Sequence, residues 1–280
     1  MDSAQAAERS QRVAAIFDRA ASTYEAVGVA WFTPIGERLV RELAPSRGER
    51  ALDIGCGRGA ALFPLAGAVG PSGRVTGIDL APGMVEATRV DVRARGLEHV
   101  DLHVMDASTP ELVKSSYGVV ASSLVVFFLP DPAAALSAWR QLLAKGGRLG
   151  ISTFGERDPR WATLDEVFRP YLPPHMLDAR TSGTAGPFAS DEGVEDLVRA
   201  AGYAGVRTAN FDVHVSFSDA DQWHAWSWSH GQRAMWEAVP DVERDRVRAA
   251  AYENLEDCRD ADGRLTLTQR VRITLAARGQ

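Results

Sequence analysis

The sequence predicts an α/β fold in which a doubly wound, mostly parallel sheet of seven strands carries a helical cap. Strand patterns alternate with helical patterns through residues 46–155, which is typical of a parallel sheet with right-handed crossovers. A glycine-rich turn, Gly55–Gly59, joins a buried strand to a helix. Two later alternating segments, 206–217 and 264–276, indicate an antiparallel pair that closes the sheet.

The N-terminal segment is predicted to form two helices, 4–21 and 32–43, that precede the sheet. Pro34 is compatible with a first helical turn, where the missing N–H is not needed. Tyr24, Trp31 and Phe32 lie between or at the start of these helices. They either pack the arm onto the core or face a ligand.

The glycine turn predicts a nucleotide-type cradle with an acidic wall. Glycines permit left-handed backbone and leave amides open to a ligand. Asp79 ends the next strand about twenty residues on, where a carboxylate can accept hydrogen bonds from a ribose diol. The spacing also fits a dinucleotide, but Asp53 lies where a pyrophosphate would sit and would repel it. An ammonium or sulfonium group would be stabilised there, which favours S-adenosylmethionine over NAD.

The remaining core elements bring further residues to the same rim. Ligands of open parallel sheets bind outside the carboxyl ends of the strands, so Asp106 is expected on the rim with Asp53 and Asp79. Phe127 and Phe128 end a strand that is apolar on both faces. The expected elements are a helix over 81–96, strands over 100–104 and 117–128, a helix from 131 to 143 that stops at 145–147, and a strand over 148–154.

Two insertions interrupt the alternation, one rich in proline and glycine and one rich in tryptophan. In the second, His230 lies one helical turn beyond Trp226, so the segment is either a cap with an aromatic core or an aromatic substrate chamber. The expected segments are 1–45 as an N-terminal arm or lid, 46–155 as the cofactor-binding core, 156–189 as a lid insertion, 190–218 as the core continuation, 219–263 as a helical cap insertion and 264–280 as the last core strand.

In four motifs the chain resembles the class I S-adenosylmethionine-dependent methyltransferases, and within them the group akin to the quinone-biosynthesis enzymes that make ubiquinone and menaquinone. The motifs are Leu52–Gly59, Gly77–Met84, Phe127–Pro132 and Leu143–Leu149. The resemblance covers roughly residues 17–154 and implies a Rossmann-like methyltransferase core. It implies that Tyr24 closes over the methionine part of the cofactor, that Asp106 accepts from the adenine amino group and that Met105 packs on the ring.

The predicted site combines these residues with aromatic side chains. Many relatives carry a histidine where this chain has Phe127 and Phe128, so no base is expected from that strand. The predicted cofactor-binding residues are Tyr24, Asp53, Gly55, Cys56, Gly57, Gly59, Asp79, Leu80, Met84, Met105, Asp106, Ala107 and Ser122. The predicted substrate-facing residues are Trp31, Phe32, Phe127 and Trp226, and the candidate bases are His175, His224 and His230.

Bulk properties narrow the class of partner. The chain has 280 residues, is 45% hydrophobic and carries a formal charge of -6 without a long basic run, so neither nucleic acid nor an anionic membrane is an expected partner. No apolar run is long enough to span a bilayer and no signal peptide is evident, which predicts a cytoplasmic protein. The 2 cysteines make no disulfide framework, and the 6 histidines are too scattered for a metal site.

The predicted function is methyl transfer from S-adenosylmethionine to an apolar small molecule such as a secondary metabolite, leaving S-adenosylhomocysteine. Oxygen is favoured as the acceptor over carbon or nitrogen, and the chain is expected to be a monomer or homodimer. A cyclase that keeps the cofactor fold without transferring methyl is the alternative, since an apolar chamber without an obvious base can also hold a folding substrate. A nucleotide-sensing module without catalysis is a third hypothesis.

Overall fold

The computed structural model describes residues 3–173 and 185–279 and contains one sheet with the strand order β3-β2-β1-β4-β5-β7-β6. β1 to β5 run parallel, and β7 runs antiparallel to both of its neighbours, β5 and β6. This confirms the predicted fold class. The strands are β1 Arg50–Ile54, β2 Arg74–Asp79, β3 Val100–Val104, β4 Tyr117–Ser123, β5 Leu143–Arg157, β6 Tyr203–Phe217 and β7 Leu265–Arg278.

Helices cover both faces of the sheet, and the burial of alternate strand residues shows why. In β1, Ala51 belongs to the core cluster that includes helices α2 and α3, whereas Leu52 and Ile54 belong to the cluster that includes α5 and α7. Strands buried on both faces read as continuous apolar runs, as the sequence does here. The core helices are α2 Phe32–Leu43, α3 Leu62–Val69, α4 Pro82–Ala94, α5 Pro132–Leu142 and α7 Asp191–Ala200.

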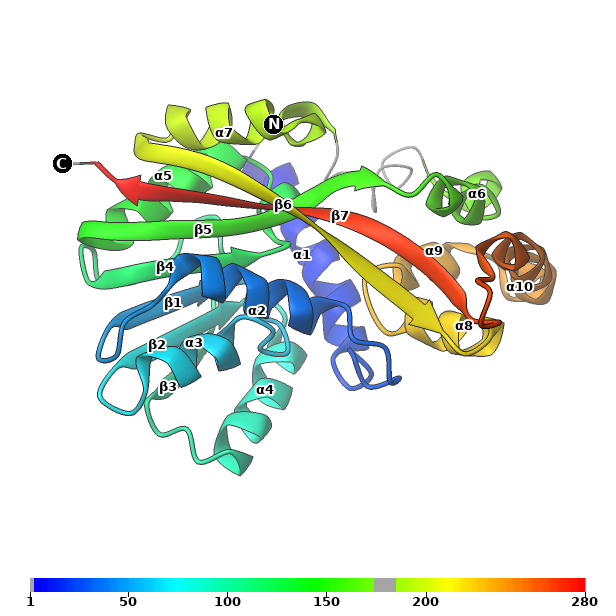
Figure 1. Ribbon diagram of the computed structural model, residues 1–280, viewed down its shortest axis with the longest axis horizontal. Helices are drawn as coiled ribbons and strands as arrows, with labels where there is room; N and C mark the ends of the chain where they lie inside the picture. Colours follow the sequence, from blue (N-terminus) through cyan, green and yellow to red (C-terminus); the bar gives the residue numbers. More distant parts are fainter. Residues whose placement is uncertain (1–2, 174–184, 280) are drawn as a thin grey trace.

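The long strands β5, β6 and β7 extend beyond the rest of the sheet and carry a group of short helices at their far end (Figure 1). Helix α1 crosses behind the sheet towards this group. The carboxyl ends of β5 and β6 point to the same side, so the group stands over the edge where ligands of parallel sheets bind. The remaining helices are α1 Ser3–Ala20, α6 Arg160–Glu166, α8 Ala220–Trp228, α9 Arg233–Ala238 and α10 Asp241–Leu255.

Two expected strand boundaries are wrong. The strand expected over 117–128 ends at Ser123, because Leu124 takes a left-handed φ of 58° and the chain then turns through a 3-10 helix, Val126–Phe128. The strand expected over 148–154 runs from Leu143 to Arg157, since its pairing with β4 and β7 continues beyond both expected ends. The turn after Leu124 carries Phe127 out of the sheet.

None of the helices within residues 3–173 and 185–279 combines the length and the apolarity that crossing a membrane requires.

Candidate active site

A cavity of about 830 Å³ lies between the carboxyl ends of the strands, helix α1 and the helices of the cap. Its floor includes Gly55, Gly57 and Asp79 from the glycine turn and the end of β2. Its walls come from segments far apart in the chain, among them Phe17 in α1 and Trp226 in α8. A volume of this size accommodates a ligand with the dimensions of a drug molecule.

The glycine turn has the backbone geometry of a ligand cradle. Gly55 and Gly57 have positive φ values of 71° and 46°. A Cβ on Gly55 would lie 2.3 Å from a methyl group of Val125, whereas one on Gly57 would meet nothing within 4 Å, so the space above Gly57 is open. Asp79 fixes the turn, because its carboxylate accepts hydrogen bonds from the amides of Gly57 at 2.8 Å and Ala81 at 2.9 Å.

Asp53 lies beneath this cradle as a buried carboxyl group without a hydrogen-bond partner in the part of the chain that the structure describes. Desolvation, and then repulsion from Asp79, raises the pKa of Asp53 to about 8. The amide of Leu62 opposes this rise, although its geometry falls short of a hydrogen bond. Burial also raises the pKa of Asp79, against the amides that bond it. Two buried acids beside an open cradle fit a ligand that brings positive charge, as the ammonium group of S-adenosylmethionine does.

The structure brings most of the predicted cofactor residues to the cavity but leaves several behind its wall. The lining residues are Tyr24, Gly55, Gly57, Asp79, Leu80, Met84, Asp106 and Ala107. Those outside the lining are Asp53, Cys56, Gly59, Met105 and Ser122. Ser122 is fully buried and donates from its hydroxyl to the carbonyl of Ile54 at 3.0 Å, which ties β4 to β1. Burial raises the pKa of the Cys56 thiol well above its usual range, so this thiol is a packing group of the turn.

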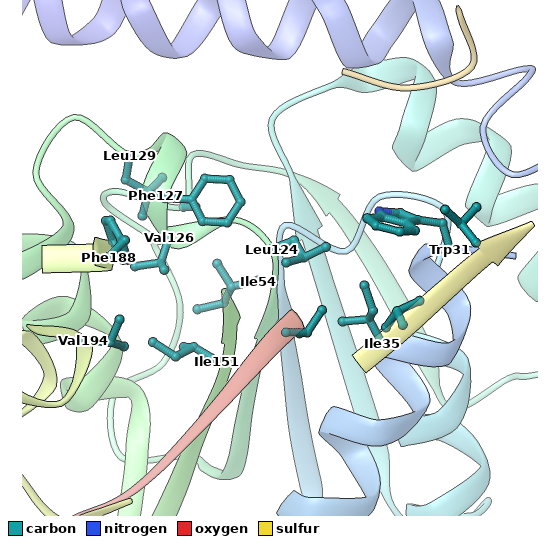
Figure 2. Packing of buried hydrophobic residues seen from close by; sticks show 14 of the residues in the cluster. Trp31, Ile35, Ile54, Leu124, Val126, Phe127, Leu129, Ile151, Phe188 and Val194 are labelled. Atoms are coloured by element: carbon teal, nitrogen blue, oxygen red, sulfur yellow. The ribbon is translucent and has the colours of Figure 1, made fainter. Parts of the chain in front are cut away.

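Aromatic rings form a large part of the cavity wall. Trp31 lies in edge contact with Trp161 and Trp226, at centroid distances of 6.1 Å and 5.7 Å. Tyr24 stacks on Phe32 at 4.5 Å. All four predicted substrate-facing residues line the cavity: Trp31, Phe32, Phe127 and Trp226. Figure 2 shows Trp31 and Phe127 on either side of Leu124, at the end of the apolar core.

A carboxylate that the sequence did not single out holds part of this wall in place. One oxygen of Glu25 accepts from the backbone amides of Trp31 at 2.8 Å, Phe32 at 2.6 Å and Thr33 at 3.0 Å. These amides begin α2 and have no partner within the helix, and a negative charge there also suits the helix dipole. Glu25 itself has a left-handed φ of 54°, so the loop from α1 is shaped around this cap.

The candidate bases are separated by the structure. His230 lines the cavity and contacts the ring of Trp226 at 4.2 Å. Its Nδ1 accepts from the amide of Gln232 at 3.3 Å, which assigns the proton of the neutral ring to Nε2. His224 does not line the cavity, because its Nε2 accepts from the indole of Trp228 at 3.0 Å inside the cap. His175 lies outside the described residues.

Sequence reasoning missed several residues of the lining, chiefly Phe17, Phe154, Trp161 and Gln232. The aromatic members gave no local signal, since an aromatic residue in a helix or strand is usually core. Gln232 follows His230 within the tryptophan-rich segment, and a polar side chain among aromatic residues could have indicated a position that faces a ligand.

Comparison with known proteins places this site in a family. A family model described as a methyltransferase domain matches residues 51–147. Aklanonic acid methyltransferase DauC of Streptomyces sp. is 43% identical over 206 residues, which are 70% of this chain and 94% of the relative. Nocamycin O-methyltransferase of Saccharothrix syringae is 37% identical over 268 residues, which are 90% of this chain and 94% of the relative.

A solved structure shares the fold. Phosphoethanolamine N-methyltransferase 2 of Haemonchus contortus, in complex with phosphomonomethylethanolamine and S-adenosylhomocysteine, has a TM-score of 0.54 and 16% identity. The match covers 88% of this chain and 52% of that chain. The chain belongs to the class I S-adenosylmethionine-dependent methyltransferases. Its cofactor is S-adenosylmethionine.

Proposed function

We propose that the protein transfers a methyl group from S-adenosylmethionine to an oxygen atom of an apolar small molecule, in the chemistry of secondary metabolites. The observation that carries this proposal is the large aromatic-walled cavity facing the glycine cradle. The names of the two relatives, one an O-methyltransferase and one acting on aklanonic acid, support the acceptor atom and the kind of substrate.

The cofactor residues divide into three groups by position. We assign the ammonium and carboxylate end to the cradle around Gly57, with Asp53 acting from below, and the ribose to Asp79. We assign the adenine to Asp106 and Ala107, because they lie on the rim beyond Asp79. Tyr24 would close over the methionine part from the side of α1, since its ring is fixed against Phe32.

The protein's part in the reaction is to position the acceptor and exclude water. S-adenosylmethionine supplies a methyl group on a sulfonium, which an acceptor oxygen takes by direct displacement. Aromatic walls hold an apolar acceptor in one orientation. Binding the two reactants in line lowers the entropic part of the activation barrier for methyl transfer. His230 is the candidate base among the described residues that line the cavity, but its neutral form carries the proton on Nε2 and is therefore set up as a donor there. This favours acceptors that ionise readily, such as carboxyl groups and acidic phenols or enols.

Mass spectrometry of reaction products tests the proposal. The protein is incubated with S-adenosylmethionine and a panel of polycyclic phenols and carboxylic acids. The expected product is heavier than the substrate by one methylene unit. Chemical cleavage of a methyl ether or methyl ester should then return the substrate mass, which shows that the methyl group is on oxygen. A product of unchanged mass would instead support the cyclase hypothesis. Absence of any methylated product together with absence of S-adenosylhomocysteine binding would contradict the proposed function.

A further inference from the structure

Two polar groups in the cap wall of the cavity have no partner in the part of the chain that the structure describes. They are the carboxamide of Gln232 and the indole N–H of Trp226, and both residues line the cavity. Gln232 is 1% exposed and Trp226 is 2% exposed, so solvent does not satisfy them either. Leaving a buried amide unpaired destabilises the folded state, and a leucine would fill the same space without that cost. A wall built only for packing does not need a glutamine.

The balance of donors and acceptors indicates what these groups bind. The carboxamide carries two N–H bonds and one carbonyl oxygen, and the indole adds a third N–H. Three donors against one acceptor favour a ligand oxygen over a ligand N–H.

The surroundings indicate the rest of the ligand. Within the cap segment 219–263, no residue that lines the cavity is an aspartate, glutamate, lysine or arginine. Trp226 packs instead against the rings of Trp31 at 5.7 Å and Phe217 at 5.2 Å. The charged side chains of the lining lie outside the cap, among them Arg9 and Arg12 in α1 and Arg157 in β5. The part of the ligand that meets the cap wall is therefore an apolar, ring-shaped body that presents an oxygen.

We propose that Gln232 and Trp226 bind a carbonyl oxygen of the methyl acceptor, present as a ketone or within a carboxyl group, and so select the substrate and fix its orientation. The inference rests on the proposed function, because it names a feature of the molecule that this function methylates. Gln232 and Trp226 are specificity residues and take no part in moving the methyl group or a proton.

Binding of three matched tricyclic probes tests the proposal. Hydroxyfluorenone carries a ketone, hydroxyfluorene has the same rings without it, and a fluorene carboxylic acid carries the carboxyl group. Their dissociation constants are measured by calorimetry on the full chain saturated with S-adenosylhomocysteine. The wild type is expected to bind the ketone or the acid about fivefold more tightly than hydroxyfluorene, as one net hydrogen bond provides. Which of the two is preferred identifies the source of the carbonyl.

The variants separate recognition from packing. Gln232→Leu should remove the preference for the carbonyl probes and leave the affinity for hydroxyfluorene unchanged. Its melting temperature should equal or exceed that of the wild type, because a polar group without a partner among the described residues has been replaced by an apolar one. Trp226→Phe should reduce the preference, and Trp223→Phe should not. Trp223 is the matched control, since its indole N–H is also buried without a partner among residues 3–173 and 185–279, but the residue does not line the cavity.

Several results would overturn the inference. They are a wild type that binds neither carbonyl probe more tightly than hydroxyfluorene, a Gln232→Leu variant that weakens all probes equally or melts lower, and a Trp223→Phe variant that behaves like Trp226→Phe. Failure of the proposed function is distinguishable, because it appears as absent methyl transfer or absent S-adenosylhomocysteine binding, neither of which depends on the carbonyl preference.

Discussion

Replacing Asp53 by asparagine should remove a pH dependence from cofactor binding. With a pKa of about 8 in the cofactor-free protein, Asp53 is ionised in about one molecule in ten at pH 7 and one in a hundred at pH 6. The ammonium group of the cofactor favours the ionised form, so binding must remove the proton. The affinity for S-adenosylhomocysteine should therefore rise about tenfold between pH 6 and pH 7. It should fall again above about pH 8, where an α-amino group loses its own proton.

Calorimetry at pH 6, 7, 8 and 9 measures this profile, and titration in two buffers of different ionisation enthalpy should detect the release of about one proton at pH 7. Asp53→Asn should give an affinity that is flat between pH 6 and pH 7 and lower than the wild type at pH 8. The exposed Asp101→Asn is the control and should keep the wild-type profile. A flat wild-type profile, or a rise that survives in Asp53→Asn, would refute the assignment of the buried charge to Asp53.

The same raised pKa determines the stability of the cofactor-free protein. Folding raises the pKa of Asp53 from 3.8 to about 8, so between these pH values the folded state holds a proton that the unfolded state has lost. The contribution of this proton to stability is complete below pH 3.8 and is lost as the pH rises through about 8. The free energy of unfolding of the wild type should therefore decrease between these values relative to Asp53→Asn, as chemical denaturation can measure.

Three further substitutions test how the site is held. Gly36→Ala places a Cβ 2.2 Å from the backbone oxygen of Ala60 and should cost about 1–3 kcal/mol in chemical denaturation, with weaker cofactor binding because α2 pushes on the glycine turn. Glu25→Ala frees the amides at the start of α2; we expect a loss of about 1–2 kcal/mol and weaker binding of apolar ligands, and an unchanged melting curve would contradict the cap. Arg272→Met leaves the carbonyls of Phe154 and Phe188 without their buried donor and should lower stability by about 2–4 kcal/mol, against no more than about 0.5 kcal/mol for Arg246→Met on the surface.

The cofactor side of the site could be predicted because its signals are local. The turn that begins at Gly55 and the strand end at Asp79 lie within one strand-turn-helix-strand unit, and the carboxyl ends of parallel strands must meet at one edge. The parallel direction of the core strands followed from the same alternation, whereas the order of the strands came from the structure. The charge argument at Asp53 also came from the sequence, although the structure buries this carboxyl and does not place it among the residues that line the cavity.

The substrate side could not be predicted residue by residue. The left-handed backbone at Leu124 ended a strand that sequence pattern alone continued to Phe128, and this turn places Phe127 in the cavity wall. His224 and His230 share one segment and one residue type, but only the second lines the cavity, because the first bonds to an indole within the cap.

The fold class, the cofactor and the rim on which the cofactor binds could be predicted from the sequence, since each depends on neighbours in the chain. The acceptor pocket depends on tertiary contacts, because it is assembled from α1, the loop before α2, the end of β4 and the cap. Whether a buried polar group such as Gln232 has a partner depends on contacts between residues far apart in the chain, and no local pattern encodes that.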